Sequence, residues 1–199
     1  MPTLVALDIA DAPELWRELG FTVEGATTWV SGVCHRLGRP GQGVVSWTLR
    51  HLPGFTELPT DPDEGGVEPD APDHPNGVIA LDHVVITTPD LARTIEAFES
   101  GGLTLRRTRQ AGTGAHTMTQ AFFTLGPVVI EVVGPPAPAA GDARFWGLTF
   151  TVTDLDATAE RLGLRLRPIK GAVQPGRRIA TLDRAVGSSV PMAFMSAKP

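Results

Sequence analysis

The stretch LDHVVITTPDLARTIEAF, residues 81–98, contains a strand signal and a helix signal side by side. Residues 84–87 are apolar or β-branched, which favours a strand, and apolar residues then recur at Leu91, Ile95 and Phe98, the spacing of one helix face. Asp90 stands between the two signals, where its carboxylate can accept hydrogen bonds from the free N–H groups of a first helical turn. The stretch therefore predicts a strand followed by a capped helix.

The same pattern occurs twice more along the chain. Residues 3–21, TLVALDIADAPELWRELGF, and residues 147–164, GLTFTVTDLDATAERLGL, also begin with an apolar run that ends at an aspartate, Asp11 or Asp154, before helical spacing starts. Further β-type runs separated by glycine-containing turns follow each predicted helix. Each unit therefore reads as a βαβββ module, and the fold class is α+β, with a helix covering one face of a mostly antiparallel sheet.

An acidic segment divides these modules. Residues 53–77 carry seven carboxylates and six prolines but no Lys or Arg, and they show no apolar periodicity. We predict that this segment is a Pro-rich linker. The predicted organisation is a degenerate module over residues 1–52, the linker, and a two-module domain over residues 78–199, with modules at 78–136 and 142–197.

Composition excludes several functional classes. The formal charge is −5, and because the 53–77 segment is so acidic, the rest of the chain is close to neutral and has no basic stripe for nucleic acid. No apolar run is long enough for a membrane span, and the N-terminus has no signal-peptide pattern. The single cysteine, Cys34, precludes an intramolecular disulfide, so we expect a cytoplasmic protein.

The openings LDHVVITTPDLARTIEAF and GLTFTVTDLDATAERL, and the endings FFTLGPVVIEVVGPP and VGSSVPMAFMS, resemble the vicinal oxygen chelate superfamily. This superfamily includes glyoxalase I, bleomycin-resistance proteins and extradiol dioxygenases. The resemblance implies that two βαβββ modules curve into a cup around one site. Residues 78–199 are similar to such a domain, and residues 1–52 would be an extra half-module that either packs outside the cup or pairs with its copy in a homodimer.

The resemblance also implies where metal ligands would lie, because metal-dependent members place one in the first strand and one in the last strand of each module. Counted from the helix-cap aspartates, the later first-strand positions are His83 and Gly147, and the last-strand positions are Glu131 and Met192. In the first module the equivalents are Leu4 and, on a looser alignment, Trp47. Only the middle module keeps a His and a Glu, and zinc and iron catalytic sites use about three protein ligands.

Three hypotheses for His83 and Glu131 therefore stay open. They bind one divalent metal (Zn, Ni, Mn or Fe), they form a metal-free pair that lines a ligand cup, or they have no functional role. A Glu inside the apolar run VVIEVV favours pairing, because burying an unpaired carboxylate costs several kcal/mol. A metal-free pair could also act as general acid and base. No organic cofactor is indicated.

Other side chains are candidates for ligand contacts in the cup. Gln120 and His116 precede the middle module's last strand, and Trp146 stands just before the third module's first strand, in which Thr149 alternates with apolar neighbours. Arg178 follows a Pro-Gly turn, where it forms either a solvated hairpin or an anion clamp at the rim. Met192 completes this set of predicted ligand-binding residues.

These observations favour a protein that binds a small organic molecule in the cup. In the first reading it is a metal-dependent lyase, isomerase or dioxygenase that uses His83 and Glu131. In the second it is a non-catalytic binding or sequestering protein of the bleomycin-resistance type, which the loss of ligands from the third module favours. In the third it has an interaction role and a relict pocket. No nucleic-acid or membrane partner is expected.

Overall fold

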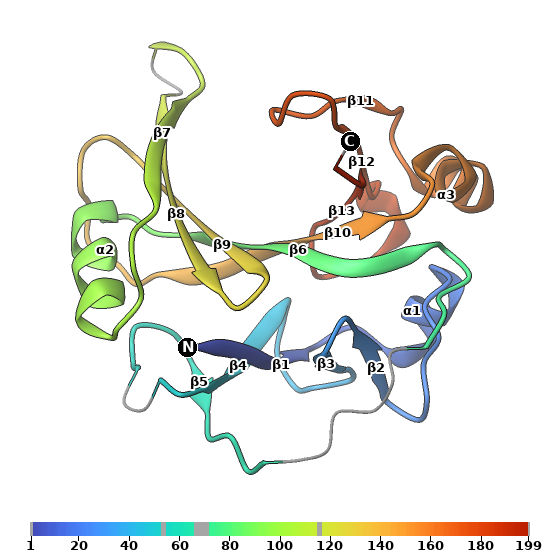
Figure 1. Ribbon diagram of the computed structural model, residues 1–199, viewed down its shortest axis with the longest axis horizontal. Helices are drawn as coiled ribbons and strands as arrows, with labels where there is room; N and C mark the ends of the chain where they lie inside the picture. The colour runs from blue at the N-terminus through green and yellow to red at the C-terminus, as the bar shows by residue number, and fades with distance from the viewer. Residues whose placement is uncertain (1, 53–54, 66–71, 115–116, 199) are drawn as a thin grey trace.

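The computed structural model describes residues 2–52, 55–65, 72–114 and 117–198. In these residues the strands form two sheets, one of eight strands in the order β11-β12-β13-β10-β6-β9-β8-β7 and one of five in the order β2-β3-β1-β4-β5. The larger sheet curves into a cup that opens at the top of Figure 1, and the smaller sheet lies beneath its floor. The repeated βαβββ prediction and the α+β class are confirmed.

The cup contains both C-terminal modules. Its floor is the antiparallel pair of β6 and β10, in which His83 lies opposite Thr149 and Val85 opposite Gly147. Each floor strand also pairs in parallel with the last strand of its own module, β6 with β9 and β10 with β13. The cup strands are β6 (Val78–Thr87), β7 (Arg107–Ala111), β8 (Met118–Leu125), β9 (Val128–Gly134), β10 (Arg144–Val152), β11 (Lys170–Gly171), β12 (Arg178–Thr181) and β13 (Met192–Ser196).

Two capped helices flank the cup on its outer sides (Figure 1). In α2 (Leu91–Ser100) the Asp90 side chain accepts a hydrogen bond from the Arg93 N–H, and in α3 (Leu155–Leu162) Asp154 accepts two, as the sequence predicts. The prediction is wrong for Asp11. The short helix α1 (Pro13–Glu18) has no side-chain cap, and the Asp11 carboxylate instead accepts hydrogen bonds from Ser188 and Ser189 of the third module.

The N-terminal module packs outside the cup, which is one of the two predicted placements. Its strands are β1 (Thr3–Ile9), β2 (Thr27–Val30), β3 (Val33–Arg36), β4 (Val44–Arg50) and β5 (Thr60–Asp61). One face is apolar and joins a single core with the convex side of the cup, where Trp16 meets Phe150 at 6.0 Å between ring centroids. The strand that runs parallel to β1 is β3, whereas β4 is antiparallel. Trp47 on β4 therefore does not occupy a last-strand position.

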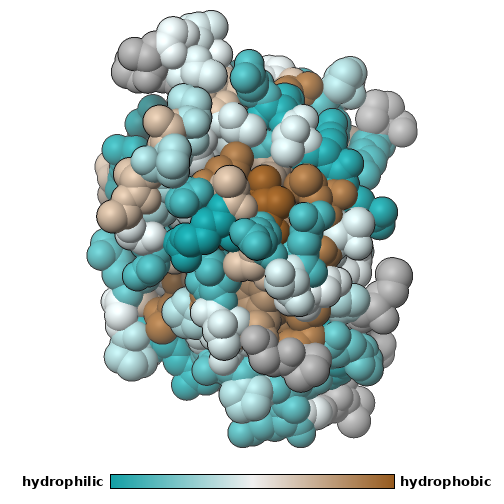
Figure 2. Space-filling model, turned by 90° about the vertical axis from the view of Figure 1, so that its left-hand side faces the viewer, coloured by the Kyte–Doolittle hydropathy of each residue, from teal (hydrophilic) through white to brown (hydrophobic). Residues whose placement is uncertain are grey.

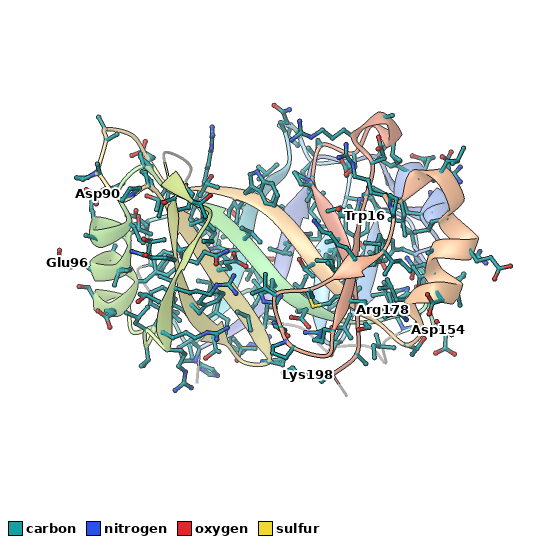
Figure 3. All side chains as sticks on the ribbon, turned by 90° about the horizontal axis from the view of Figure 1, so that it is seen from above. Trp16, Asp90, Glu96, Asp154, Arg178 and Lys198 are labelled. Atoms are coloured by element: carbon teal, nitrogen blue, oxygen red, sulfur yellow. The ribbon has the colours of Figure 1, made fainter. Side chains whose placement is uncertain are left out.

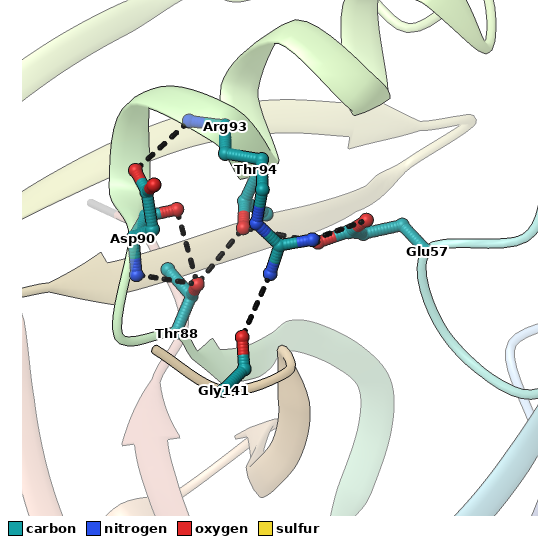
Figure 4. A network of polar contacts seen from close by, with 6 residues as sticks. All are labelled: Glu57, Thr88, Asp90, Arg93, Thr94 and Gly141. Carbon is teal, nitrogen blue, oxygen red and sulfur yellow. Dashed lines mark hydrogen bonds and ion pairs between the residues drawn. The ribbon is translucent and has the colours of Figure 1, made fainter. Parts of the chain in front are cut away.

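The described part of segment 53–77 is packed against the rest of the protein. Phe55 and Leu58 are buried in the core, and β5 extends the N-terminal sheet. Glu57 lies at the first turn of α2, where it accepts a hydrogen bond from Thr94 and forms an ion pair with Arg93 at 3.4 Å (Figure 4). The domain limits stay a prediction, but this part of the predicted linker is a structural element rather than a spacer.

The surface beside α2 is mainly hydrophilic and surrounds an apolar area near its centre (Figure 2). Leu91, Thr94 and Phe98 of this helix are buried, so its apolar face is turned toward the sheet.

Within the described part of the chain, no helix has both the length and the apolar character needed to cross a membrane.

Candidate functional site in the cup

A cavity of about 340 Å³ lies inside the cup, a size typical of sites for small organic molecules. Four of the sequence-predicted residues line it, namely His83, Gln120, Glu131 and Thr149. They come from β6, β8, β9 and β10, so residues distant in sequence meet on one concave surface. Alternation along the strands explains this, since the intervening residues Val84, Ile130 and Phe150 are buried in the core on the convex face.

Glu131 ends a chain of polar contacts on the wall formed by β7, β8 and β9. The Gln120 amide donates a hydrogen bond to the Glu131 carboxylate and accepts hydrogen bonds from the Arg109 guanidinium, with Nε of Arg109 at 2.8 Å. The amide group is oriented by this network, because its oxygen faces the arginine and its nitrogen faces the carboxylate. The network fixes Glu131 without a direct ion pair.

A β-bulge brings a second carboxylate next to His83. In the register of β6 and β10, His83 lies opposite Thr149 and Leu81 opposite Phe150, so Asp82 is an extra residue. Asp82 and His83 therefore both lean to the cup side, although consecutive strand residues normally face opposite ways. Nδ1 of His83 lies 2.6 Å from Oδ1 of Asp82. The contact is close but is not aligned as a hydrogen bond, so we treat it as electrostatic.

Arg177 holds Asp82 in place from the opposite side. Nη2 of Arg177 donates to Oδ2 of Asp82 at 2.7 Å, and Nε of Arg177 donates to the Ser196 carbonyl. The Thr151 hydroxyl also donates to Oδ2 of Asp82, at 2.7 Å. Burial alone would raise the pKa of Asp82, but the contacts with His83, Arg177 and Thr151 outweigh it and hold that pKa well below its usual range. Asp82 is therefore a fixed anion beside the imidazole.

His83 is only 6% exposed, and it turns Nδ1 toward this anion. No hydrogen bond of Nε2 is found within the described chain, and His83 is one of the residues that line the cavity. An anion beside one ring nitrogen orients the imidazole and leaves the other nitrogen to exchange a proton with a ligand. The arrangement can therefore support general acid–base chemistry.

Three other predicted ligand-binding residues lie outside this cavity. Trp146 and Met192 line a separate hollow at the outer side of β13, and Trp146 is 49% exposed. Met195 lines the cup, and side chains along a strand alternate between its two faces, so Met192, three residues earlier on β13, lies on the convex side. Arg178 points outward beside α3, where it pairs with Asp156 at 2.6 Å, and Figure 3 shows it close to Asp154 rather than over the floor of the cup.

The register also corrects the ligand position in the third module. Glu131 lies opposite Val85, and the equivalent pair in the third module is Ala193 opposite Thr149. The last-strand position is therefore Ala193 rather than Met192. The first-strand position, Gly147, is closed to any side chain, because a Cβ there would lie 2.6 Å from the Pro191 carbonyl oxygen.

These residues do not make a complete metal site. His83 and Glu131 supply two ligands, Gly147 and Ala193 supply none, and no group of three His, Cys, Asp or Glu side chains in the described ranges could hold a metal ion. Catalytic zinc and non-haem iron sites need about three protein ligands. His116 lies outside the described residues.

Several residues of the cup were not predicted from the sequence. Arg107, Arg109, Phe122 and Lys170 line the cavity. The spacing of Arg107 and Arg109 in a strand was a usable signal, since residues two apart share a face. The bulge at Asp82 has no such signal, because it depends on the register of two strands.

The family described as the Glyoxalase/Bleomycin resistance protein/Dioxygenase superfamily matches residues 82–181, about half of the chain. The protein belongs to this superfamily. The match begins at Asp82 within β6 and ends at Thr181, so it includes every strand of the cup except β13, and the family assignment and most of the cavity lining concern the same part of the chain. Among curated proteins, no match is found.

Solved structures agree on the fold. A mutant of 4-hydroxymandelate synthase from Streptomyces coelicolor superposes with a TM-score of 0.67 at 12% identity, covering 99% of this chain and 94% of that one. A fusion of a xylose isomerase-like TIM barrel with 4-hydroxyphenylpyruvate dioxygenase gives 0.63 at 10% identity, covering 99% and 49%. Methylmalonyl-CoA epimerase from Mycobacterium tuberculosis gives 0.49 at 20% identity, covering 62% and 91%. At these identities the likeness to the first two structures supports the glyoxalase-type fold alone.

Proposed function

We propose that the cup of residues 78–199 binds a small organic molecule and that His83 exchanges a proton with it. The convergence of His83, Gln120, Glu131 and Thr149 on one cavity carries this proposal. A cavity with a few oriented polar groups on an otherwise apolar lining is the usual form of a small-molecule site. Phe122, Ile179 and Met195 supply apolar lining here.

His83 is the general acid or base in this proposal, and Asp82 is its positioning residue. Nε2 would take a proton from, or return it to, a carbon or oxygen of the ligand, while Asp82 stabilises the imidazolium formed in between. Glu131, oriented by Gln120, is the second proton-transfer group on the adjoining strand. The reaction class is proton transfer of the isomerase or lyase type.

Ligand binding can be tested by thermal denaturation against a library of small aromatic and amphipathic compounds. A ligand at about a hundred times its Kd stabilises the folded state by about 2.7 kcal/mol, which raises Tm by several degrees. We expect such shifts in the native protein and in the control Arg178→Gln, whose side chain lies outside the cup, and smaller shifts in Ile179→Ala, which removes part of the apolar lining. A flat response across the library would overturn the proposal.

Proton transfer is tested separately with the compounds that bind. Each is incubated with the protein in D₂O and examined by mass spectrometry. Deuterium should enter ligands with an acidic C–H bond, and His83→Gln should abolish this without abolishing the Tm shift. Binding without deuterium exchange in the native protein would favour the non-catalytic binding function. The incomplete set of metal ligands also favours that function.

Metal dependence has its own test. Metal analysis of native protein beside His83→Ala should give substoichiometric metal in both. One equivalent of Zn, Ni, Mn or Fe that is lost in the variant would contradict the metal-free proposal. A cytoplasmic location and a homodimer stay predictions; the protein's mass in light scattering checks the latter.

A further inference from the structure

Three cationic side chains line the cavity without an acidic partner. Arg107, Arg109 and Lys170 all contribute to its lining, and none of them forms an ion pair within the described residues. Other arginines do, such as Arg177 with Asp82. Glu131 is the one carboxylate among the described lining residues, so positive charge predominates in the cup.

The three cations stand on opposite walls. Arg107 and Arg109 belong to β7 at one rim, and Lys170 belongs to β11 at the other (Figure 1). A molecule seated between these rims would therefore meet positive charge from both sides. Because the formal charge of the chain is −5, this local excess runs against the overall charge of the protein.

Two contacts prepare the arginines for a ligand. Arg109 places Nε and Nη2 on the Gln120 oxygen, which leaves Nη1 without a partner in the described chain. The guanidinium carbon of Arg107 lies 4.6 Å from the centre of the Phe122 ring, and that of Arg109 lies 5.7 Å from it. Cation–π contacts hold both groups over an apolar surface, where less ordering remains to be done on binding.

We infer that the ligand of the cup is an organic anion, with a carboxylate or phosphate head group held by Arg107, Arg109 and Lys170 and an aromatic or apolar body against the apolar lining that Val173 and Ile179 supply. This inference rests on the proposed function, since it specifies the class of molecule bound at the same site. Guanidinium groups match the geometry of both head groups, and the Phe122 ring holds the two guanidinium groups in place beside them.

Calorimetric titration of the whole protein with 2-naphthoate, 2-naphthyl phosphate and the neutral 2-naphthamide tests it. At least one of the anions should bind about tenfold or more tightly than the amide, which corresponds to about 1.4 kcal/mol. The better anion identifies the head group. In the native protein, raising NaCl from about 0.05 M to about 0.5 M should weaken anion binding and leave the amide unchanged.

Matched variants locate the effect. Arg107→Gln and Lys170→Gln should each reduce anion affinity several-fold, and the double variant, which keeps only Arg109 of the three cations, should lose most of the preference for the anion over the amide. Arg106→Gln is the control, because Arg106 immediately precedes β7 and does not line the cavity. Melting temperatures measured without ligand show whether each variant is folded. If a variant is not folded, the salt dependence of anion binding to the native protein still tests the inference.

The outcomes separate this inference from the proposed function. Equal affinity of the native protein for anions and amide, or a preference for the anion that the double variant keeps undiminished, overturns the inference and leaves a small-molecule site. If none of the three naphthalene probes binds while other library compounds raise Tm, the inference is also overturned and the small-molecule site remains. Silence of both the probes and the library overturns the proposed function as well.

Discussion

Acid should destabilise the protein through His35, which lies between the N-terminal module and the cup. The side chain is fully buried, with ring centroids of Trp16 at 5.6 Å and Phe150 at 5.8 Å. Nδ1 contacts the Val33 carbonyl at 3.1 Å, whereas Nε2 has no aligned partner within the described residues. Burial lowers the pKa of His35 to about 4, and the carbonyl contact opposes this only in part.

The sign follows from proton linkage. Between the unfolded pKa of about 6.5 and the folded pKa of about 4, the unfolded state binds more protons at this site, so the folded state loses stability as pH falls. Each pH unit in the window costs about 1.4 kcal/mol, and from pH 7 to pH 5 the expected loss from His35 is about 2 kcal/mol. Burial also lowers the pKa of nearby His74, which adds to the loss in native protein.

Urea unfolding at pH 7 and pH 5, at one ionic strength, measures this. The variant His35→Leu lacks the titrating group, so its loss between the two pH values should be about 2 kcal/mol smaller than that of the native protein. His51→Asn removes an exposed imidazole and should keep the native loss. If His35→Leu loses as much stability as the native protein, burial of a neutral His35 is not the cause.

Two further substitutions test the packing of the cup by urea unfolding. Gly147→Ala should lower the free energy of unfolding by about 1–3 kcal/mol, because the added Cβ would lie 2.6 Å from the Pro191 carbonyl oxygen. Gly171→Ala is the control and should lower it much less, because no atom lies within 4 Å of the added carbon. Equal losses in the two variants would contradict the overlap at Gly147. Arg177→Met should cost about 3–5 kcal/mol, because it leaves the Asp82 carboxylate buried without its cation. Arg178→Met removes only an exposed pair and should change stability far less, so similar losses for the two arginines would refute the assigned role of Arg177.

Much of the cup could be predicted because local signals agree with the tertiary fold. Asp90 and Asp154 mark where each helix begins, and counting back from them gives the strand positions that face the cup. His83, found by this count, and Thr149, found from its alternation with apolar neighbours, both line the cavity. The reason is physical, since a helix start fixes the phase of the strand before it, and side chains in that strand alternate with a period of two.

The same period explains the errors. The last-strand position was counted from a turn rather than from a helix cap, and a miscount of one residue exchanged Ala193 for Met192 on the opposite face. Arg178 was chosen where its neighbour Arg177 is the residue that points inward. The bulge at Asp82 breaks the alternation altogether, and only the pairing of β6 with β10 reveals it.

The two halves of the cup supply different groups to the cavity. The middle module keeps His83 and Glu131, whereas the equivalent positions of the third module, Gly147 and Ala193, carry no donor, and at Gly147 the Pro191 carbonyl leaves no room for one. What the third module supplies instead is the Arg177 contact that fixes Asp82. Because a lone His–Glu pair needs orientation more than it needs further ligands, the third module has a role that a symmetric metal site would not give it. Chemistry in this cup should therefore depend on both modules, even though the side chains that would exchange protons belong to only one of them.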